Sequence, residues 1–316
     1  MYDVGRKNKK RNGDEYRVYK ELCQISGEEN VLRDEPMKRH TTFRIGGPAD
    51  YFVTVHSKEE IKEILLLCKK EQISYYILGN GSNLLVGDKG YRGVVIQICR
   101  QMNEIYTKGN KIYAQAGALL SKVAAEALTN SLTGFEFASG IPGTLGGAVM
   151  MNAGAYGGEM KHVLESAEVL TPEGEFLTLS LEELKLGYRT SVIAENDYTV
   201  LSAVITLEKG NPDEIKAYMD DLKERRTTKQ PLEYASAGST FKRPEGYFAG
   251  KLIQDSGLKG YSVGDAQVSE KHSGFVINRG NASAEDVLTL IKHVQDTVEQ
   301  KFGVRLETEV KRIGEF

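Results

Sequence analysis

The sequence contains few of the residues that build disulfide-rich or metal-binding proteins. Among its 316 residues there is no tryptophan, and there are only 7 prolines and 3 cysteines. Cys23, Cys68 and Cys99 are far apart and form no CxxC pair, which argues against a disulfide framework or a cysteine-rich metal site. The 5 histidines form no HExxH pattern. We therefore expect no metal ion.

The sequence also lacks long apolar runs and a strong excess of charge of either sign. No apolar run approaches the roughly 20 residues that span a bilayer, and residues 1–16 lack the apolar core of a signal peptide. The formal net charge is −3 at pH 7, which gives no reason to expect a nucleic-acid or membrane partner. We therefore expect a cytoplasmic protein.

The chain is long enough for two or three packed units, and its pattern of elements predicts an α+β fold. Residues 1–20 are polar and show no periodicity, which predicts a disordered extension. Residues 21–105 and 106–210 each combine short apolar strands with helices, and 211–303 form a third such unit.

Signals at the ends of two longer helices are clear. Asn211 and Pro212 combine an N-cap with a first-turn proline and predict a helix that runs to about Arg226. Residues 283–302 carry apolar side chains at helical spacing, and Gly303 ends that helix.

A short glycine-rich segment, Gly79-Asn80-Gly81-Ser82-Asn83, lies between two apolar strands. Small residues let consecutive backbone N–H groups converge on an anion, an arrangement called a nest. The segment is not a dinucleotide fingerprint, because Leu84 stands where GxGxxG has its third glycine and a strand follows. A hairpin-like turn is the alternative interpretation.

A second glycine-rich stretch follows in the second unit. So many glycines and prolines in an ordered region indicate backbone that lies tight against something. A flat cofactor would fit, and close helix packing is the alternative. The residues concerned are Gly140, Ile141, Pro142, Gly143, Gly146, Gly147, Ala148, Asn152, Ala153 and Gly154.

Several polar residues stand out less by themselves. Arg189 is a single arginine, and residues 225–231 are a basic run at a helix C-terminus, where cations suit the helix dipole. Ser239 follows a glycine but has no GxSxG motif around it, so a hydrolase nucleophile is not indicated. The alternation in 304–313 predicts a strand with Glu307 and Glu309 on one face, where surface ion pairing is the ordinary explanation.

Taken jointly, these stretches resemble one family, the UDP-N-acetylenolpyruvoylglucosamine reductases. Any one motif is weak, but their shared order along the chain, from about His40 to Ile313, is specific. The motifs are 40–47, the two glycine-rich stretches, Tyr188-Arg189, 226–229, 237–241, 249–253 and 306–310.

The resemblance implies a fold in which two α+β subdomains, 21–105 (with 304–316) and 106–210, cradle FAD, as in the PCMH/VAO-type FAD-binding fold. A third α+β domain, 211–303, would bind the UDP-sugar. Residues 79–83 then correspond to the pyrophosphate nest and the second stretch lines the flavin, with Arg44 and Arg226 as further contacts. No histidine lies in 141–158, which fits a non-covalent flavin.

The resemblance also implies a reaction, the NADPH-dependent reduction of UDP-N-acetylglucosamine enolpyruvate to UDP-N-acetylmuramate in peptidoglycan precursor synthesis. A hydride from flavin N5 would add to the terminal carbon, and the other carbon would take a proton from Ser239. Arg189 would bind the carboxylate, because a guanidinium forks onto two oxygens. The family motif selects Glu309 over Glu307, and a protonated Glu309 would need a pKa raised by burial.

Substrate contacts and partners follow from the same resemblance. Lys229 and Lys251 would hold phosphates or the carboxylate, and Gln267 and His272 belong to the substrate wall. Only nine residues separate Arg189 from Thr199, so the chain matches the short form of the family, which lacks the loop with a substrate tyrosine. We expect a monomer. The alternatives are a flavin oxidase of another small molecule and a non-catalytic nucleotide-sugar binding protein.

Overall fold

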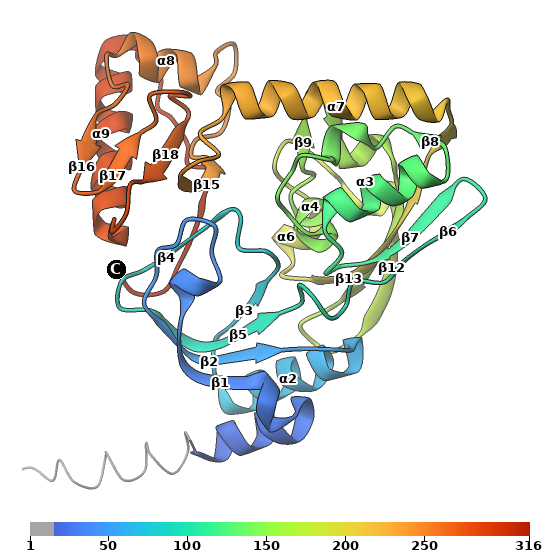
Figure 1. The fold of residues 1–316 in the computed structure, drawn as a ribbon. Coiled ribbons are helices and arrows are strands. Elements are labelled where there is room, and N and C mark those ends of the chain that lie inside the picture. The colour runs from blue at the N-terminus through green and yellow to red at the C-terminus, as the bar shows by residue number, and fades with distance from the viewer. Residues whose placement is uncertain (1–15) are drawn as a thin grey trace, which may run out of the picture.

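The computed structural model describes residues 16–316, whose strands form three sheets of four or five strands and three smaller pairs (Figure 1). Each larger sheet belongs to one of the three predicted units, and helices accompany all of them. The α+β class is therefore confirmed. Within the described residues, no helix combines the length and the apolar character needed to cross a membrane.

The first unit is a mixed sheet in the order β1-β2-β5-β3, in which β1 is antiparallel to β2 and the other neighbours are parallel. Parallel strands need a crossover connection, and α2 (Lys58–Glu71) supplies one between β2 and β3. Ser57 caps α2 by accepting a hydrogen bond from the Glu60 N–H. The strands are β1 (Val31–Pro36), β2 (Pro48–Thr54), β3 (Tyr75–Leu78) and β5 (Tyr91–Gln97).

A helix over residues 16–26 precedes this sheet. Val18 and Leu22, one turn apart, are buried in the same core as the apolar face of α2. The prediction of a disordered extension over 1–20 is therefore wrong for residues 16–20, because their apolar side chains have a core to pack against. Residues 1–15 lie outside the described part of the chain.

The second unit is a fully antiparallel sheet in the order β12-β11-β13-β7-β6. Its buried side chains belong to the same hydrophobic cluster as those of α2, so the first two units share one core. The strands are β6 (Ile105–Lys108), β7 (Lys111–Gln115), β11 (Leu164–Leu170), β12 (Phe176–Ser180) and β13 (Thr199–Thr206), and the helices are α3 (Leu120–Thr129), α4 (Leu145–Met150), α5 (Leu181–Leu184) and α6 (Val192–Glu195).

The third unit has its own core and an antiparallel sheet in the order β15-β18-β17-β16. The long helix α7 (Pro212–Lys229), capped by Asn211 as predicted, runs from the second unit to the third (Figure 1). Gly303, at a φ of 68°, ends α9 as predicted. The elements are β15 (Ala235–Ser239), β16 (Ser262–Val263), β17 (Ala266–Val268), β18 (Phe275–Asn278), α8 (Ala249–Asp255) and α9 (Ala284–Phe302).

Short elements complete the chain. The strand pairs are β8 (Leu132–Thr133) with β14 (Glu208–Lys209), and β9 (Gly154–Ala155) with β10 (Gly158–Glu159). The 3₁₀ turns are η1 (Glu28–Asn30), η2 (Met37–Arg39), η3 (Glu136–Ala138) and η4 (Met160–His162).

The segment 304–313 was expected to be one strand, and this prediction is wrong in extent. Only β19 (Lys311–Ile313) is a strand, and it pairs in parallel with β4 (Leu84–Val86) of the first unit. Before it, Leu306 and Val310 are buried in the core of the third unit. The segment crosses from one unit to another, so it cannot remain in a single sheet.

The first unit also holds the third through the start of α9. Asp88 accepts hydrogen bonds from the N–H groups of Ala284 (2.8 Å) and Glu285 (3.1 Å). Ser283 and Asp286 form a capping box at the same end. All four N–H groups that lack a partner inside the helix are thus satisfied, two of them from another unit.

Replacing Asp88 should therefore destabilise the protein. In Asp88→Ala two helix N–H groups lose their acceptor, and we expect the free energy of unfolding to fall by about 1–2 kcal/mol. Urea denaturation followed by circular dichroism measures this. Asp220→Ala, which removes an exposed carboxylate from α7, should have a smaller effect. Equal stability of the two variants would contradict the role of Asp88.

Candidate active site

The first glycine-rich segment, residues 79–83, is a turn with unused backbone donors. Across the described residues, none of its five backbone N–H groups donates a hydrogen bond to the protein. Gly81 is buried at a φ of 62°, and a Cβ there would lie 2.0 Å from the His40 carbonyl oxygen. A buried N–H group without a partner is costly. The arrangement therefore fits an anion, as the nest interpretation predicts.

The second glycine-rich stretch touches the first. The Asn80 side chain donates a hydrogen bond to the Pro142 carbonyl (2.7 Å), and a Cβ on Gly79 would lie 2.4 Å from Thr144 Oγ1. Close packing explains another of these glycines, because a Cβ on Gly146 would lie 2.9 Å from the Cβ of Ala116. Close packing thus explains Gly146, and a flat cofactor against the rest of the stretch stays a prediction.

The two arginines that are predicted to contact the cofactor differ in their exposure. Arg44 is exposed at a φ of 57° between the buried Phe43 and Ile45. Arg226, on α7, packs its Cδ against Gly140, where a Cβ would lie 3.2 Å away. Burial lowers the pKa of Arg226 below its ordinary value. The free amides, the contacting loops and these guanidinium groups fit a cofactor that carries a diphosphate.

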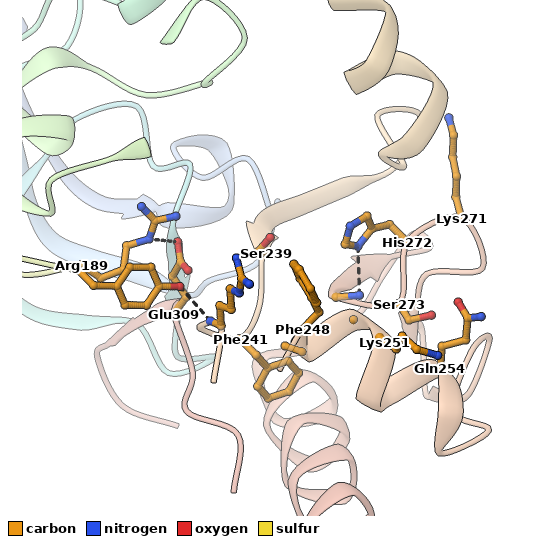
Figure 2. Close-up of a pocket in the computed structure, with 15 residues that line it drawn as sticks. Arg189, Ser239, Phe241, Phe248, Lys251, Gln254, Lys271, His272, Ser273 and Glu309 are labelled. Atoms are coloured by element: carbon orange, nitrogen blue, oxygen red, sulfur yellow. Dashed lines mark hydrogen bonds and ion pairs between the residues drawn. The ribbon is translucent and has the colours of Figure 1, made fainter. Parts of the chain in front are cut away.

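A cavity of about 470 Å³ lies between the second and third units and contains all three predicted catalytic residues (Figure 2). Arg189 and Glu309 lie on one side, and Ser239 lies between them and the side formed by His272 and α8. The full lining is Tyr188, Arg189, Ser239, Phe241, Arg243, Phe248, Ala249, Gly250, Lys251, Gln254, Lys271, His272, Ser273, Gly274 and Glu309.

Arg189 and Glu309 form a largely buried ion pair. Arg189 Nε lies 2.9 Å from Glu309 Oε1, and the two side chains are 19% and 13% exposed. The contact lacks hydrogen-bond geometry, so the buried Nε–H has no acceptor among the described residues. Burial raises the pKa of Glu309, and this outweighs the opposite effect of Arg189 and Lys242.

The backbone fixes Glu309 beside Ser239. The Glu309 N–H donates to the carbonyl of Thr240 (2.8 Å), the residue that follows Ser239, and Asn83 Nδ2 donates to the Glu309 carbonyl (3.2 Å). Ser239 is exposed to the cavity, and within the described residues its hydroxyl makes no hydrogen bond. The hydroxyl is therefore available to a ligand.

The structure separates two glutamates that alternation placed on one face. Glu307 is 74% exposed and pairs with Lys242 (3.0 Å), whereas Glu309 faces the cavity. The prediction of a shared face is wrong because this segment is irregular, and each of its residues meets a different partner.

Two of the four predicted substrate residues line the cavity, and two do not. Lys251 and His272 line the cavity, and Lys251 Nζ pairs with Asp255 (2.8 Å). Burial lowers the pKa of His272. Gln267 is buried in β17, donates to the Gly260 carbonyl (3.0 Å) and does not line this cavity, and its contact with the substrate stays a prediction. Lys229 is exposed at the end of α7 and lies outside the lining.

The side chain of Asn152 is also hydrogen-bonded within the protein. It is 1% exposed, and its amide bonds Glu159, Gly187 and the Lys161 N–H. Both N–H donors of this side chain are thus used inside the protein, and a contact of Asn152 with the flavin stays a prediction.

Sequence reasoning gave no site role to several side chains of the lining, among them Tyr188, Arg243, Phe248 and Lys271. The Tyr188 hydroxyl accepts the Arg243 N–H (2.9 Å), and the Arg243 guanidinium lies 4.0 Å from the centre of the Phe248 ring. Two signals were available: Tyr188 belongs to the Tyr188-Arg189 motif, and Arg243 follows the 237–241 motif by two residues.

The paired glycine-rich loops on two sheets place the chain among the FAD-binding oxidoreductases, and a family model described as "FAD binding domain" matches residues 49–180. A second model, "UDP-N-acetylenolpyruvoylglucosamine reductase, C-terminal domain", matches residues 230–313.

Whole-chain relatives identify the particular family. UDP-N-acetylenolpyruvoylglucosamine reductase of Clostridium kluyveri is 58% identical over 93% of this chain and 96% of its own length, and that of Alkaliphilus metalliredigens is 55% identical over 96% and 99%. The crystal structure of the Thermus caldophilus enzyme matches with a TM-score of 0.77 and 37% identity, over 90% of this chain and 98% of its own. The chain belongs to the UDP-N-acetylenolpyruvoylglucosamine reductase family, which confirms the resemblance and the fold.

Gly81→Ala should impair FAD binding. The new Cβ strains a residue of positive φ and displaces the His40 carbonyl, so we expect the dissociation constant for FAD to rise at least about tenfold. Flavin fluorescence during titration of the apoprotein measures it. Gly109→Ala provides a matched control, because its φ is 68° and nothing lies within 4 Å. If both variants bind FAD as the parent does, the nest is not the FAD site.

The raised pKa of Glu309 predicts a pH dependence of stability. In the folded protein Glu309 keeps its proton at pH values above about 4.3, which is the pKa of a glutamate in the unfolded chain. The stabilisation is therefore complete below that pH and is lost as pH rises through the folded pKa. Glu309→Gln removes this titration, so the Tm of the variant relative to the parent should increase between about pH 4 and pH 8. Calorimetry with Glu307→Gln as control measures it, and a difference independent of pH would contradict it.

Proposed function

We propose that this protein reduces UDP-N-acetylglucosamine enolpyruvate to UDP-N-acetylmuramate, with FAD as the hydride carrier and NADPH as the reductant. The observation that carries the proposal is one cavity that holds Arg189, Ser239 and Glu309 beside the free amides of residues 79–83. The product would serve peptidoglycan precursor synthesis in the cytoplasm. We further propose that the protein acts as a monomer.

The first two units would hold FAD and the third the UDP-sugar. When bound, FAD supplies the hydride that the terminal carbon of the enolpyruvyl group accepts. The amides of residues 79–83, with Arg44 and Arg226, would hold its diphosphate. The remaining backbone of the second stretch, residues 140–154 apart from the Asn152 side chain, would line the ring.

Arg189 would bind the substrate carboxylate. Charge develops beside this carboxylate during the reaction, which is costly unless donors are already aimed at it. A guanidinium offers a planar fork of donors, and the buried Nε–H of Arg189 has no acceptor in the described protein. Glu309 thus satisfies the guanidinium of Arg189 only in part, and the guanidinium can bind a further anion.

Ser239 would donate the proton to the carbon that bears the carboxylate. Its hydroxyl has no hydrogen-bond partner in the described residues and opens on the cavity. The alkoxide that remains would regain a proton from water, because Ser239 is exposed. Glu309, with its pKa raised by burial, would donate a hydrogen bond in its protonated form to the enol-like oxygen that forms.

Cationic and apolar side chains at the other side of the cavity suit a nucleoside diphosphate. Lys251, Lys271 and Arg243 would meet the phosphates. Phe248, 61% exposed, offers a ring on which a base can stack. The Nδ1 of His272 accepts the Gly274 N–H (3.1 Å), so a neutral ring carries its proton on Nε2. Lys229 stays a predicted phosphate contact.

The two half-reactions test this proposal. The purified protein should be yellow, and under anaerobic conditions NADPH should bleach its flavin absorbance. UDP-N-acetylglucosamine enolpyruvate should then restore the absorbance, whereas oxygen should do so slowly. Rapid reoxidation by oxygen alone would favour a flavin oxidase, and a colourless protein that binds no added FAD would favour a non-catalytic binding protein.

Ser239→Ala separates proton transfer from the rest of the cycle. The variant should be bleached by NADPH at the parental rate, because that step needs no protonation of carbon. Its reoxidation by the enolpyruvyl substrate should be slower by roughly 10²–10⁴. Stopped-flow absorbance measures both rates. Parental reoxidation by the variant would exclude Ser239 as the proton donor.

A further inference from the structure

Asn152 is a buried residue of the second glycine-rich stretch, and its side chain connects this stretch to the turn that carries Arg189. Its side chain is 1% exposed. Nδ2 donates to the Gly187 carbonyl (3.0 Å) and to Glu159 Oε2 (2.9 Å), and Oδ1 accepts the Lys161 N–H (2.9 Å). Both N–H donors of the amide are therefore used, and its oxygen holds one acceptor bond.

The turn held by Asn152 is tight and strained. Gly187 and Thr190 form an isolated bridge, with the Gly187 N–H donating to the Thr190 carbonyl (3.1 Å). Between them Arg189 has a φ of 56°, a left-handed conformation that is unfavourable for a residue with a Cβ. Such a conformation persists only where neighbouring contacts fix it.

Two hydrogen bonds with residues 150–152 fix the turn, one at each end. Asn152 bonds the carbonyl of Gly187 at its start, and the buried Ser191 hydroxyl donates to the Met150 carbonyl (2.5 Å) at its end. Met150 is the last residue of α4, whose N-cap Thr144 abuts Gly79. A single stretch thus contacts the nest and holds the Arg189 turn.

Asparagine is suited to this position for two reasons. Its φ is 45°, a left-handed conformation that asparagine tolerates better than most other residues with a side chain. The amide also supplies donors and an acceptor together, whereas aspartate at the same place would offer no N–H to the Gly187 carbonyl.

We propose that Asn152 is a positioning residue for the reduction of the enolpyruvyl group and acts through Arg189. By holding the Gly187 carbonyl it fixes the strained turn, and so aims the guanidinium at the substrate carboxylate. This inference rests on the proposed function. Without the Asn152 amide the turn relaxes, and a misplacement of about 1 Å is enough to slow a positioned reaction about 100-fold.

The test compares the half-reactions of Asn152→Gly with those of the parent holoenzyme. Glycine accepts the positive φ and lacks only the side chain. We expect unchanged FAD content and flavin spectrum, and an unchanged rate of bleaching by NADPH. Reoxidation by UDP-N-acetylglucosamine enolpyruvate should slow about 10- to 100-fold. Equal slowing of both half-reactions, or loss of FAD, would overturn the proposal, because it would indicate a general structural role.

Further variants make the result specific. Asn152→Asp keeps the acceptor for Lys161 but lacks the donor for Gly187, and should show the same selective slowing. Asn110→Gly removes a comparable amide-to-carbonyl bond, to Leu207 (3.0 Å), in the remote β6–β7 hairpin, and should leave both rates unchanged. Either variant behaving otherwise contradicts the assignment.

A double variant tests whether Asn152 acts through Arg189. In an Arg189→Lys background, Asn152→Gly should slow reoxidation by less than about threefold further, because the two residues serve one interaction. Multiplicative effects would overturn the proposal. If the parent itself is not reoxidised by the enolpyruvyl substrate, the proposed function fails, a result distinct from failure of the role of Asn152.

Discussion

Glu309 is the residue at which the three units of the chain meet. Its carboxylate pairs with Arg189 of the second unit, its N–H bonds Thr240 of the third, and its carbonyl accepts from Asn83 of the first. The backbone bonds fix the residue whatever its charge, so the side chain can sit in a site that raises its pKa. A buried ion pair contributes little net stability. We infer that this pair is kept for the geometry of the cavity.

Besides the buried ion pair, the glycine-rich segment 79–83 is a second feature that contributes little to the stability of the fold. None of the backbone N–H groups of residues 79–83 has a protein acceptor within the described residues, and for the buried Gly81 this is unfavourable unless a ligand supplies one. The shared core of the first two units, with the contact of Asn80 on Pro142, holds the loops in place regardless. Contacts inside the protein therefore hold the backbone donors of residues 79–83 in a fixed arrangement, and such preorganisation lowers the cost of binding an anion.

Much of the fold was predictable because the signals are local. The caps at Asn211 and Gly303, and the alternation of small residues with apolar strands around residues 79–83, describe the chain's own geometry. The errors arise where partners are remote in sequence. Residues 16–20 have a core to join, and 304–310 leaves one unit for another. Periodicity cannot report either fact.

The prediction of the site shows the same difference between local sequence signals and partners that are remote in sequence. Arg189, Ser239 and Glu309 were found through motifs, and the cavity brings them together. The same resemblance assigns Asn152 and Gln267 to ligands, and in the structure their side chains donate to the carbonyls of Gly187 and Gly260. A motif records that a residue type is needed at a position. Whether it touches a ligand or holds a neighbour depends on burial, which the sequence does not state.

The third unit is attached to the first by contacts that restrict relative movement. Asp88 caps α9, Asn278 bonds the Phe43 carbonyl (3.1 Å), and β19 extends from one unit into a strand pair of the other. Ser239 lies on β15 of the third unit, whereas Arg189 lies on the second. Transition-state stabilisation depends on donors held in place before the reaction. These attachments, far from the reacting atoms, therefore set the spacing on which the chemistry of the cavity depends.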